Sequence, residues 1–530
     1  MKKLLSVLLS LLLLAPACAG AVTTADYERY AEPISVTVGK EFIASPGFAD
    51  ASHTQAKNNM VDLIRDVYNI NVELAWESDE YNSKLALSVA AGDLPDIFVV
   101  RDKLLYSQLV ENGMLADLSD AYEKYASDYV RTVNESYDNQ TLLTDSEGHL
   151  YGIGSGNYYY GSHEHLWLRQ DWLDALGMKA PSTLEELEQV LIAFRDKYNS
   201  KGLLIAGDDP FGGVGALYSA FPIAAANGAY PSTWIEGKDG KALYGSVMPG
   251  MKDTLELMAR WYKEGLIDYE FATRTIDERG ALFAAGESGS AFGPWSLGYF
   301  ITDLRLNPEA KLCVLNAPVN ANGEFRMLRA MPYANILCVS AKCAHPEAMI
   351  KMLSLEFDAY LGFYADGFER IAADVQNNVS WNALFPTGNM NLVNANRMLE
   401  YAECVRERVE DGGWANPSQY SASMQTNANA VADFVAGDTQ NANGWIGYYG
   451  RVIAAKQFTA ENAVPICQVF DGTTESMSDL WASMKSLEQQ TFLSIIVGQS
   501  PVDSFDTFVA QWYNQGGDVI TAEVNAVLGK

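Results

Sequence analysis

The chain has few basic residues for its size. Lys and Arg number 37 against 67 Asp and Glu in 530 residues, which gives a net charge of −30. An excess of negative charge this large repels phosphate backbones and anionic lipid surfaces. The composition therefore argues against a nucleic-acid-binding protein and against an anionic membrane surface. The single long hydrophobic run lies at the very start of the sequence, which excludes an integral membrane protein.

Cysteine is also scarce. The chain has 6 Cys, and no two of them form a C-x-x-C pair. The cysteines beyond the N-terminal segment are odd in number and widely spread, which does not fit a disulfide framework. We predict instead that they pack as small hydrophobic residues. These residues are Cys313, Cys338, Cys343, Cys404 and Cys467.

The motifs that mark common catalytic sites are missing. The sequence has no P-loop, no G-x-S-x-G elbow and no H-E-x-x-H zinc motif. Among 67 acidic residues, carboxylate pairs arise by chance, so their spacing neither supports nor excludes a glycosidase. No residue is therefore predicted to be catalytic.

Three short segments resemble ligand motifs without completing them. Gly152–Gly156 misses the dinucleotide-binding spacing, which favours a glycine-rich turn. His163 and His165 point to opposite sides of a strand, so a surface pair is favoured over a metal site. Asp145–Gly148 lacks the ligands that should follow in a calcium loop and predicts a turn. These segments give no metal site.

The first residues have the pattern of an export signal. Two lysines precede an apolar run from Leu4 to Leu14, and small residues follow it. This run is typical of a secretory signal and too short for a membrane-spanning helix. Two processing routes stay open, because Cys18 is either lipidated as the mature N-terminus or removed at an overlapping A-x-A site. We predict a signal at residues 1–20 and a polar tether at residues 21–33.

Hydrophobic periodicity indicates an α/β fold. Strand-like segments at residues 34–38, 71–75 and 97–100 alternate with segments of helical period. This alternation implies parallel strands with helices on the faces of the sheet. The pattern resumes later in the chain, where Ser182 and Glu185 form a capping-box pattern at the start of a helix. Two lobes are predicted.

Aromatic residues are abundant and often lie in polar, glycine-rich surroundings. The chain has 11 Trp and 28 Tyr. Trp295 follows Gly-Pro, and Trp445 and Tyr448 lie among glycines. A flat ring on a loop suits the apolar face of a sugar, with carboxylates and amides binding the hydroxyl groups. The alternative is that each indole is simply buried between elements.

A series of motifs runs in order along nearly the whole mature chain. It begins with LALSVAAGDLPDIFVV at Leu85–Val100 and NGMLADL at Asn112–Leu118. It continues with GHLYGIG (Gly148–Gly154), LWLRQDWLDALGMKAPSTLEEL (Leu166–Leu187), LFAAGESGSAFGPW (Leu282–Trp295), VSAKCAHPEAMIKMLS (Val339–Ser354) and SPVDSFDTFVAQWYNQGGDVITAEVN (Ser500–Asn525). The ordered series resembles family 1 extracellular solute-binding proteins of ABC importers, within their carbohydrate- or oligosaccharide-binding lipoprotein subgroup.

The resemblance implies a two-lobed, periplasmic-binding-protein-like fold of type II, with a hinge and a cleft between the lobes. The N-terminal lobe would comprise residues 34–155 and about 310–375, and the C-terminal lobe about 156–309 and 376–530. The protein would be a monomeric, non-enzymatic receptor outside the cytoplasm. It would capture an oligosaccharide and deliver it to ABC permease subunits. A peptide or other non-sugar solute remains an alternative ligand, and a secreted glycoside hydrolase an alternative function.

The resemblance also carries functional roles to individual residues. The ligand would contact Arg101, Asp102, Tyr159, Trp295, Trp445 and Tyr448, with Trp295 as the stacking platform. Cys18 would carry the lipid that anchors the protein to the cell membrane. Many relatives have an EF-hand-like calcium loop after the Thr-Leu-Glu-Glu-Leu helix, but residues 196–202 lack most of its carboxylates. We therefore expect neither calcium there nor any other metal or cofactor.

Overall fold

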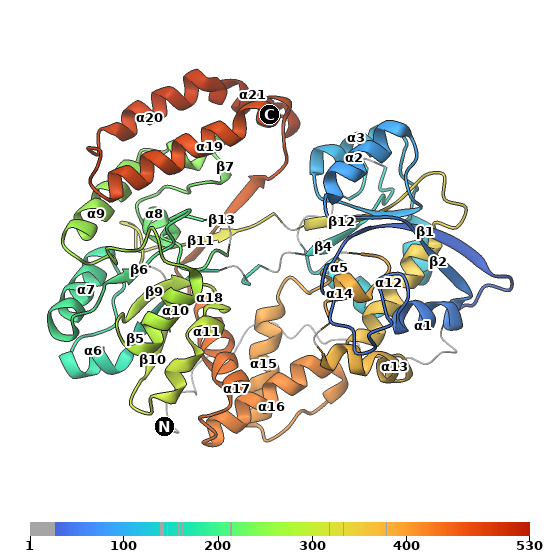
Figure 1. The fold of residues 1–530 in the computed structure, drawn as a ribbon, viewed down its shortest axis with the longest axis horizontal. Helices are drawn as coiled ribbons and strands as arrows, with labels where there is room; N and C mark the ends of the chain where they lie inside the picture. Colours follow the sequence, from blue (N-terminus) through green and yellow to red (C-terminus); the bar gives the residue numbers. More distant parts are fainter. Residues whose placement is uncertain are drawn as a thin grey trace.

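Two lobes built around β-sheets lie side by side, and the chain passes between them more than once (Figure 1). The computed structural model describes residues 27–137, 143–145, 147–156, 159–161, 163–212, 215–316, 318–331, 333–377, 379–388 and 390–530. Cys18 and the predicted signal lie outside the described residues. The predicted α/β class and two-lobed organisation are confirmed.

The N-terminal lobe holds a five-stranded sheet with strand order β2-β1-β3-β12-β4. β1 pairs in parallel with β2 and β3, whereas β12 is antiparallel to β3 and β4. The three strands expected between residues 34 and 100 are confirmed as β1, β2 and β3. The strands are β1 (Ile34–Glu41), β2 (Ile70–Ser78), β3 (Ile97–Val100), β4 (Ile153–Gly156) and β12 (Tyr333–Val339).

Local sequence explains where the helices of this lobe begin and end, as α1 illustrates. Asn58 caps α1 by accepting hydrogen bonds from the backbone N–H groups of Met60 and Val61. Asn69 ends the helix in the left-handed conformation, with φ of 67°. The helices are α1 (Asn59–Tyr68), α2 (Tyr81–Ala91), α3 (Lys103–Glu111), α4 (Ser119–Tyr125), α5 (Asp128–Glu135), α12 (Glu347–Tyr360), α13 (Ala365–Gln376) and α14 (Trp381–Leu384).

Part of the predicted tether packs against the N-terminal lobe. The hydroxyl of Tyr27 donates to Asp358 at 3.1 Å, and that of Tyr30 donates to Glu347 at 2.6 Å. Both tyrosines also contact the hydrophobic core of this lobe. The polar composition of residues 21–33 predicted a free segment throughout, but its last residues belong to the folded lobe.

The C-terminal lobe contains two four-stranded sheets, of order β10-β5-β9-β6 and β11-β13-β7-β8. The strands are β5 (His165–Arg169), β6 (Leu203–Leu204), β7 (Trp234–Glu236), β8 (Ala242–Tyr244), β9 (Ser290–Gly293), β10 (Leu312–Leu315), β11 (Phe325–Arg329) and β13 (Ala463–Phe470). The helices are α6 (Gln170–Leu176), α7 (Leu184–Tyr198), α8 (Phe221–Ala226), η3 (Gly245–Val247), α9 (Gly250–Lys263), α10 (Ile276–Ala285), α11 (Leu297–Phe300), η4 (Thr302–Leu306), α19 (Glu475–Ile496), α20 (Ser504–Trp512), η7 (Tyr513–Gly517) and α21 (Asp518–Val527). A large shared hydrophobic core joins the two sheets to the C-terminal helices.

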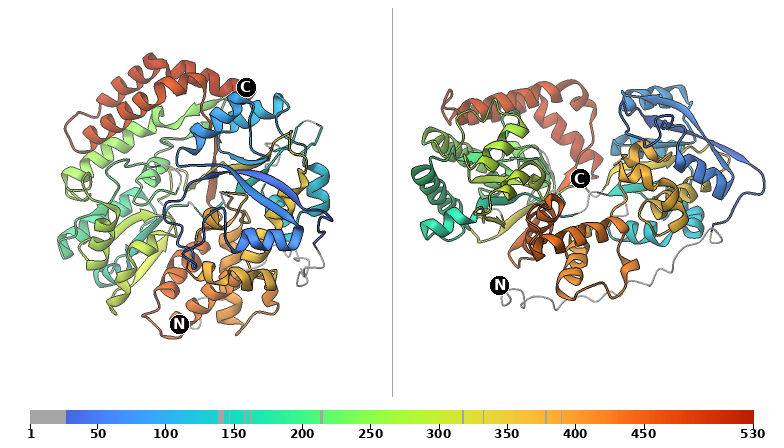
Figure 2. Two further views of the ribbon diagram at one scale, coloured as in Figure 1. Left: turned by 45° about the vertical axis from the view of Figure 1, so that its right-hand side comes forward. Right: turned by 60° about the horizontal axis from the view of Figure 1, so that its bottom comes forward.

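A group of helices lies beside the junction of the two lobes, drawn in orange in Figure 2. It comprises α15 (Arg397–Glu410), η5 (Pro417–Gln419), α16 (Ala422–Ala436), α17 (Ala442–Ile446), η6 (Gly447–Ile453) and α18 (Ala454–Phe458). α15 and α16 pack together around a small core that contains Tyr401 of α15 and Met424 and Val431 of α16. α17, the π-helix η6 and α18 follow one another without a break.

The passages between the lobes differ from the predicted boundaries. β10 pairs antiparallel with β5, so the segment after residue 310 still belongs to the C-terminal lobe. The return to the N-terminal lobe comes between β11 and β12, and the core of that lobe extends to Ala395. An apolar pattern predicts that a segment is a strand, but it does not show which sheet the strand joins. The predicted lobe boundary near residue 310 was therefore wrong.

Within the glycine-rich segment at residues 152–156, Ile153–Gly156 form a strand and not the turn that the composition predicts. Ile153, Gly154 and Ser155 pair with β12. A Cβ on Gly154 would lie 2.1 Å from the ring of Tyr333, and one on Gly156 would lie 1.6 Å from the hydroxyl of Tyr137. The glycines are therefore needed because aromatic side chains cover this strand.

The N-cap of α7 lies one residue later than predicted, and the reciprocal bond of a capping box goes to the residue before it. Thr183, rather than Ser182, caps the helix by accepting from the N–H of Glu186 at 3.2 Å. The carboxylate of Glu186 accepts hydrogen bonds from the backbone and hydroxyl of Ser182. Both registers fit the S/T-x-x-E pattern, so sequence alone could not separate them.

The cysteines of the described residues are all unpaired. Cys338 and Cys404 are buried, as expected for small hydrophobic residues, whereas Cys467 is exposed. Within the described part of the chain, no helix is long and apolar enough to cross a membrane.

Gly154→Ala should destabilise the fold. The added methyl group collides with the Tyr333 ring, which is 1% exposed and cannot move away easily. Overpacking of this kind costs about 1–3 kcal/mol. Urea unfolding should show a lower midpoint. Gly298→Ala is the matched control, because its nearest neighbour lies 3.5 Å from the new Cβ. Equal stability of both variants would contradict the role assigned to Gly154.

Candidate functional site

The sequence-predicted residues Arg101 and Asp102 follow β3 at the edge of the N-terminal lobe. Arg101 forms an ion pair with Glu41, with 2.6 Å between Nη2 and Oε2. Its guanidinium also lies 5.1 Å from the ring centre of Tyr81. Asp102 caps α3 by accepting from the N–H groups of Leu104 and Leu105. Both side chains thus have structural partners in addition to any contact with a ligand.

The two lobes touch directly next to Asp102. Lys103 Nζ, at the start of α3, lies 2.8 Å from Oδ2 of Asp471, which follows β13 in the other lobe. The two side chains are 15% and 25% exposed. A Cβ built on Gly472 would lie 3.6 Å from Oδ1 of Asp102. The end of β3 is therefore part of the junction between the lobes.

Tyr159 lies in the passage from β4 to β5. It is 9% exposed and packs edge-on against Tyr137, with 5.8 Å between ring centres. The guanidinium of Arg329, at the end of β11, lies 3.6 Å from the centre of the Tyr159 ring. Two passages between the lobes thus meet at this stacked pair.

Trp295 follows β9 and is half-buried. The guanidinium carbon of Arg451 lies 4.2 Å from the centre of the indole and 4.5 Å from that of Tyr401. Tyr299 is 48% exposed, and its ring packs edge-on against Trp295 at 5.7 Å. Trp295 therefore belongs to a partly exposed aromatic cluster that also holds one arginine.

Trp295 and the passage from β4 to β5 meet at a shared cluster. Met398, Ala455 and Phe458 form this small core, and both Tyr160 and Trp295 pack against it. The rings of Tyr160 and Phe458 are stacked, with centres 4.7 Å apart. The structure thus brings Trp295 near the residue that follows Tyr159, whereas Arg101 and Asp102 lie on the other lobe.

Trp445 and Tyr448 are packed against neighbouring side chains. Trp445 is 4% exposed and belongs to a core with Trp167 and Leu297. Tyr448 is half-buried, with its ring centre 5.4 Å from that of Phe434. Both residues lie on the continuous helix α17–η6–α18 that carries Arg451. In this conformation they support that helix.

Sequence reasoning missed Tyr299, Arg329 and Arg451. Tyr299 lies four residues after Trp295, within the short helix α11 that follows it, and this spacing could have identified it. Arg329 and Arg451 had no comparable signal, because the rings on which they stack come from distant parts of the sequence.

The prediction that His163 and His165 form a surface pair is wrong. They are 4% and 0% exposed, and Glu164 between them is 7% exposed. Phe325 and Phe458 cover the imidazoles, with ring centres 4.9 Å from His163 and 5.3 Å from His165. Burial lowers the pKa of His165 to about 3 and that of His163 well below its usual value, and raises that of Glu164. Both imidazoles are therefore neutral at neutral pH, and burial favours the uncharged form of Glu164.

Residues 196–202 comprise the end of α7 and the turn that leads to β6. Asn199 ends α7 in the left-handed conformation, with φ of 53°. A Cβ on Gly202 would lie 2.3 Å from the backbone of Leu266, so the loop packs tightly against the lobe. No group of three metal-ligating side chains occurs within the residues that the structure describes.

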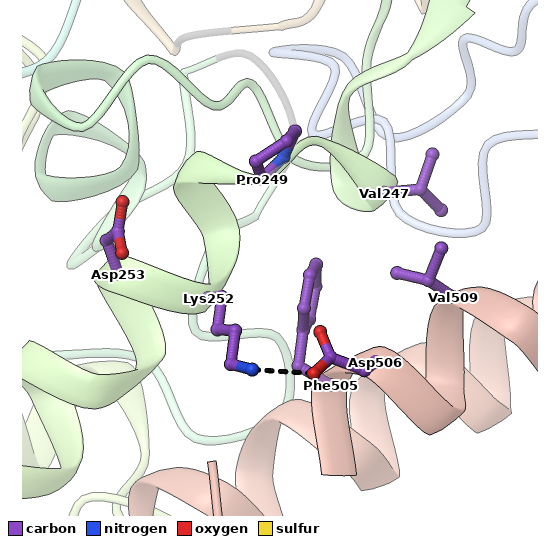
Figure 3. Close-up of a pocket in the computed structure, with 7 residues that line it drawn as sticks. All are labelled: Val247, Pro249, Lys252, Asp253, Phe505, Asp506 and Val509. Atoms are coloured by element: carbon purple, nitrogen blue, oxygen red, sulfur yellow. Dashed lines mark hydrogen bonds and ion pairs between the residues drawn. The ribbon is translucent and has the colours of Figure 1, made fainter. Parts of the chain in front are cut away.

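A separate pocket of about 420 Å³ opens between the start of α9 and α20 (Figure 3). Lys252 at its wall forms ion pairs with Asp503 and Asp506, at 2.9 and 2.6 Å. Val247, Phe505 and Val509 supply its apolar lining. It contains none of the sequence-predicted ligand residues and lies within the C-terminal lobe, so it is distinct from the Trp295 cluster.

Sequence comparison decides the family. The profile of the bacterial extracellular solute-binding proteins matches residues 50–362, more than half of the 530 residues. The chain belongs to this family. Its members bind solutes and are not enzymes, in agreement with the missing catalytic motifs.

Individual relatives match only part of their length. The polygalacturonan/rhamnogalacturonan-binding protein YtcQ of Bacillus subtilis is 24% identical over 308 residues, which cover 57% of this chain and 60% of the relative. The fructooligosaccharide ABC transporter substrate-binding protein FusA of Streptococcus pneumoniae is 25% identical over 233 residues, covering 40% and 42%. The chain thus matches less than two thirds of each.

Solved structures match over nearly the whole chain. An HMO-binding, ABC-transporter-associated solute-binding protein from Bifidobacterium longum infantis gives a TM-score of 0.61 at 18% identity, covering 94% of this chain and 98% of that one. The S. pneumoniae FusA EF-hand mutant in complex with fructo-nystose gives 0.56 at 15% identity, covering 93% and 98%. The likeness confirms the two-lobed, periplasmic-binding-protein-like fold.

Lys103→Glu should favour separation of the lobes. The substitution replaces an attractive pair with two facing carboxylates, that of the introduced side chain and that of Asp471, across the lobe junction. Exposed or partly exposed pairs are worth up to about 1 kcal/mol, enough to shift a balanced equilibrium several-fold. Small-angle scattering at low salt should give a larger radius of gyration. The double variant, with Lys103→Glu and Asp471→Lys together, should restore the wild-type value, and an unchanged profile in the single variant would show that this pair does not hold the lobes together.

Proposed function

We propose that this protein is the extracytoplasmic substrate-binding component of an ABC transporter. It captures an oligosaccharide between its lobes, closes on it as a monomer and delivers it to permease subunits. Family membership supports the solute-binding role. The names of YtcQ and FusA, which refer to polygalacturonan or rhamnogalacturonan binding and to fructooligosaccharide transport, support a carbohydrate ligand.

The observation that carries the proposal is the aromatic cluster at the end of β9. Trp295 is half-buried and Tyr299 is 48% exposed, and both follow the strand on a short helix-forming segment. Exposed aromatic rings held by a rigid element bind the apolar faces of sugar rings with little loss of side-chain entropy. Arg451 stacks on the indole, and Tyr299 beside it offers the more exposed ring to a sugar.

The remaining predicted residues have subordinate roles in the proposal. Arg101 and Asp102 would supply polar groups from the N-terminal lobe when the lobes close. Tyr159 would contribute at the passage between the lobes, beside the ring-stacked Arg329. Trp445 and Tyr448 would reach a ligand only if the helix that carries them shifted, since both are packed in the described conformation.

Trp295→Ala should abolish measurable sugar binding. Loss of a central aromatic anchor costs about 2–4 kcal/mol, or roughly 30- to 1,000-fold in affinity. A thermal-shift screen of plant and host oligosaccharides identifies ligands of the wild type, and calorimetry then compares the variant. Tyr269→Ala is the control, because Tyr269 is 59% exposed on the same lobe and outside the cluster. Unchanged affinity of Trp295→Ala would remove Trp295 from the site, and release of shorter sugars would indicate a hydrolase.

Cys18 is proposed as the attachment point of a membrane lipid. The diacylglycerol of a lipoprotein cysteine has two chains and anchors stably, whereas one chain binds a membrane only weakly. Cells that express the full chain should retain it in the membrane fraction, and Cys18→Ser should release it. If both forms are soluble, the A-x-A site is cleaved instead and the lipoprotein assignment is wrong.

A further inference from the structure

We infer that Arg451 recognises a carboxylate on the ligand, so that the preferred oligosaccharide contains an acidic sugar, a uronate. This inference rests on the proposed function, because it assigns a substrate class to the same site. It is carried by the position of one arginine that stacks against two aromatic rings of the site and pairs with no carboxylate of the described residues.

Arg451 is held between Trp295 and Tyr401. Its guanidinium carbon lies 4.2 Å from the centre of the Trp295 ring and 4.5 Å from that of Tyr401, so both rings are within cation–π distance of the charge. Burial raises the pKa of Tyr401, which keeps the phenol neutral, so Tyr401 gives the guanidinium no negative charge. Stacking leaves the N–H groups at the edge of the guanidinium as its means of binding a ligand.

Arg451 takes part in no ion pair with a carboxylate among the described residues. The chain is rich in acidic residues, and three other arginines between residues 305 and 406 do have carboxylate partners. The pairs are Arg305 with Asp303, Arg326 with Glu324, and Arg406 with Glu403 and Asp411. A half-buried cation without a counter-charge is unfavourable unless a ligand supplies one.

The backbone is specially shaped to bring Arg451 to Trp295. η6 is a π-helix of 7 residues, a conformation that is rare and frequent at functional sites. Gly450 lets this helix approach so closely that a Cβ there would lie 2.5 Å from the carbonyl oxygen of Trp295. The position of the guanidinium is therefore fixed by local structure and not by an ion pair.

A uronate fits this geometry better than a neutral sugar. Its carboxylate is planar and sits one bond from the ring, so the ring can lie against Trp295 or Tyr299 while the carboxylate accepts paired hydrogen bonds from Arg451. Because the protein carries a net charge of −30, an anionic ligand needs such a local cation to overcome long-range repulsion.

The test compares uronate-containing oligosaccharides with the same compounds after chemical reduction of each carboxyl group to a primary alcohol. Calorimetry on the mature protein should give tighter binding of an acidic member than of its reduced counterpart, by about 10- to 100-fold. Arg451→Gln should remove most of this difference, and Arg451→Lys, which keeps the charge but not the planar fork, should retain part of it.

Arg408→Gln is the matched control. It removes the same charge, but from a side chain on α15 that donates a hydrogen bond to Asn429 on α16. It should bind like the wild type. Thermal melts of each variant identify any loss of folding, and Arg451→Lys keeps the test informative if Arg451→Gln is unstable.

The other outcomes overturn the inference in distinguishable ways. Equal or tighter binding of the reduced sugars refutes the acidic preference but leaves the proposed carbohydrate function standing. A preference for acidic sugars that survives in Arg451→Gln refutes the assignment to Arg451. If no saccharide of either kind binds, the proposed function fails and the inference fails with it.

Discussion

Close packing at the passages between the lobes is the constraint on which the rest of the molecule depends. Each lobe is assembled from segments on both sides of a passage, so neither core is complete until the chain has crossed more than once. The glycines of β4 allow Tyr137 and Tyr333 to lie against the strand just before the first passage. In the segment that follows, Phe325 and Phe458 pack against the buried imidazoles of His163 and His165. Aromatic packing thus holds the chain in place on both sides of this passage.

The passages between the lobes carry neutral or ring-stacked side chains, unlike the acidic rest of the chain. The chain as a whole is strongly acidic, but His163 and His165 are buried and neutral, burial raises the pKa of Glu164 between them, and Arg329 and Arg451 stack on aromatic rings. Burying charged groups at a moving junction would be costly, because each change of contacts would strip or restore their hydration. Neutral side chains avoid that cost, and cation–π contacts offset part of it for the stacked guanidinium groups.

Local patterns predicted what local interactions determine. The strands β1, β2 and β3 were found because alternation and burial in a short window suffice to specify them. β4 was missed because a strand of glycines has no hydrophobic pattern and exists through its pairing with β12, some 180 residues later. The burial of His163 was missed for the same reason, since the rings that cover it come from β11 and α18. At the site, Trp295 had a recognisable motif, whereas Arg451 gains its meaning from Trp295 and Tyr401, both far away in sequence.

The helix that carries Arg451 also supports the passage between the lobes. α17, η6 and α18 run without a break from Ala442 to Phe458, and Phe458 at the end of this run stacks on Tyr160 in the passage. In the proposed site, a ligand at Trp295 and Arg451 would therefore contact the element against which the passage packs. Any shift of that element changes the contacts of Tyr160, His163 and His165 together, because Phe458 touches all three rings. The continuous helix between Arg451 and Phe458 is thus the element through which binding at the proposed site would be coupled to the orientation of the lobes.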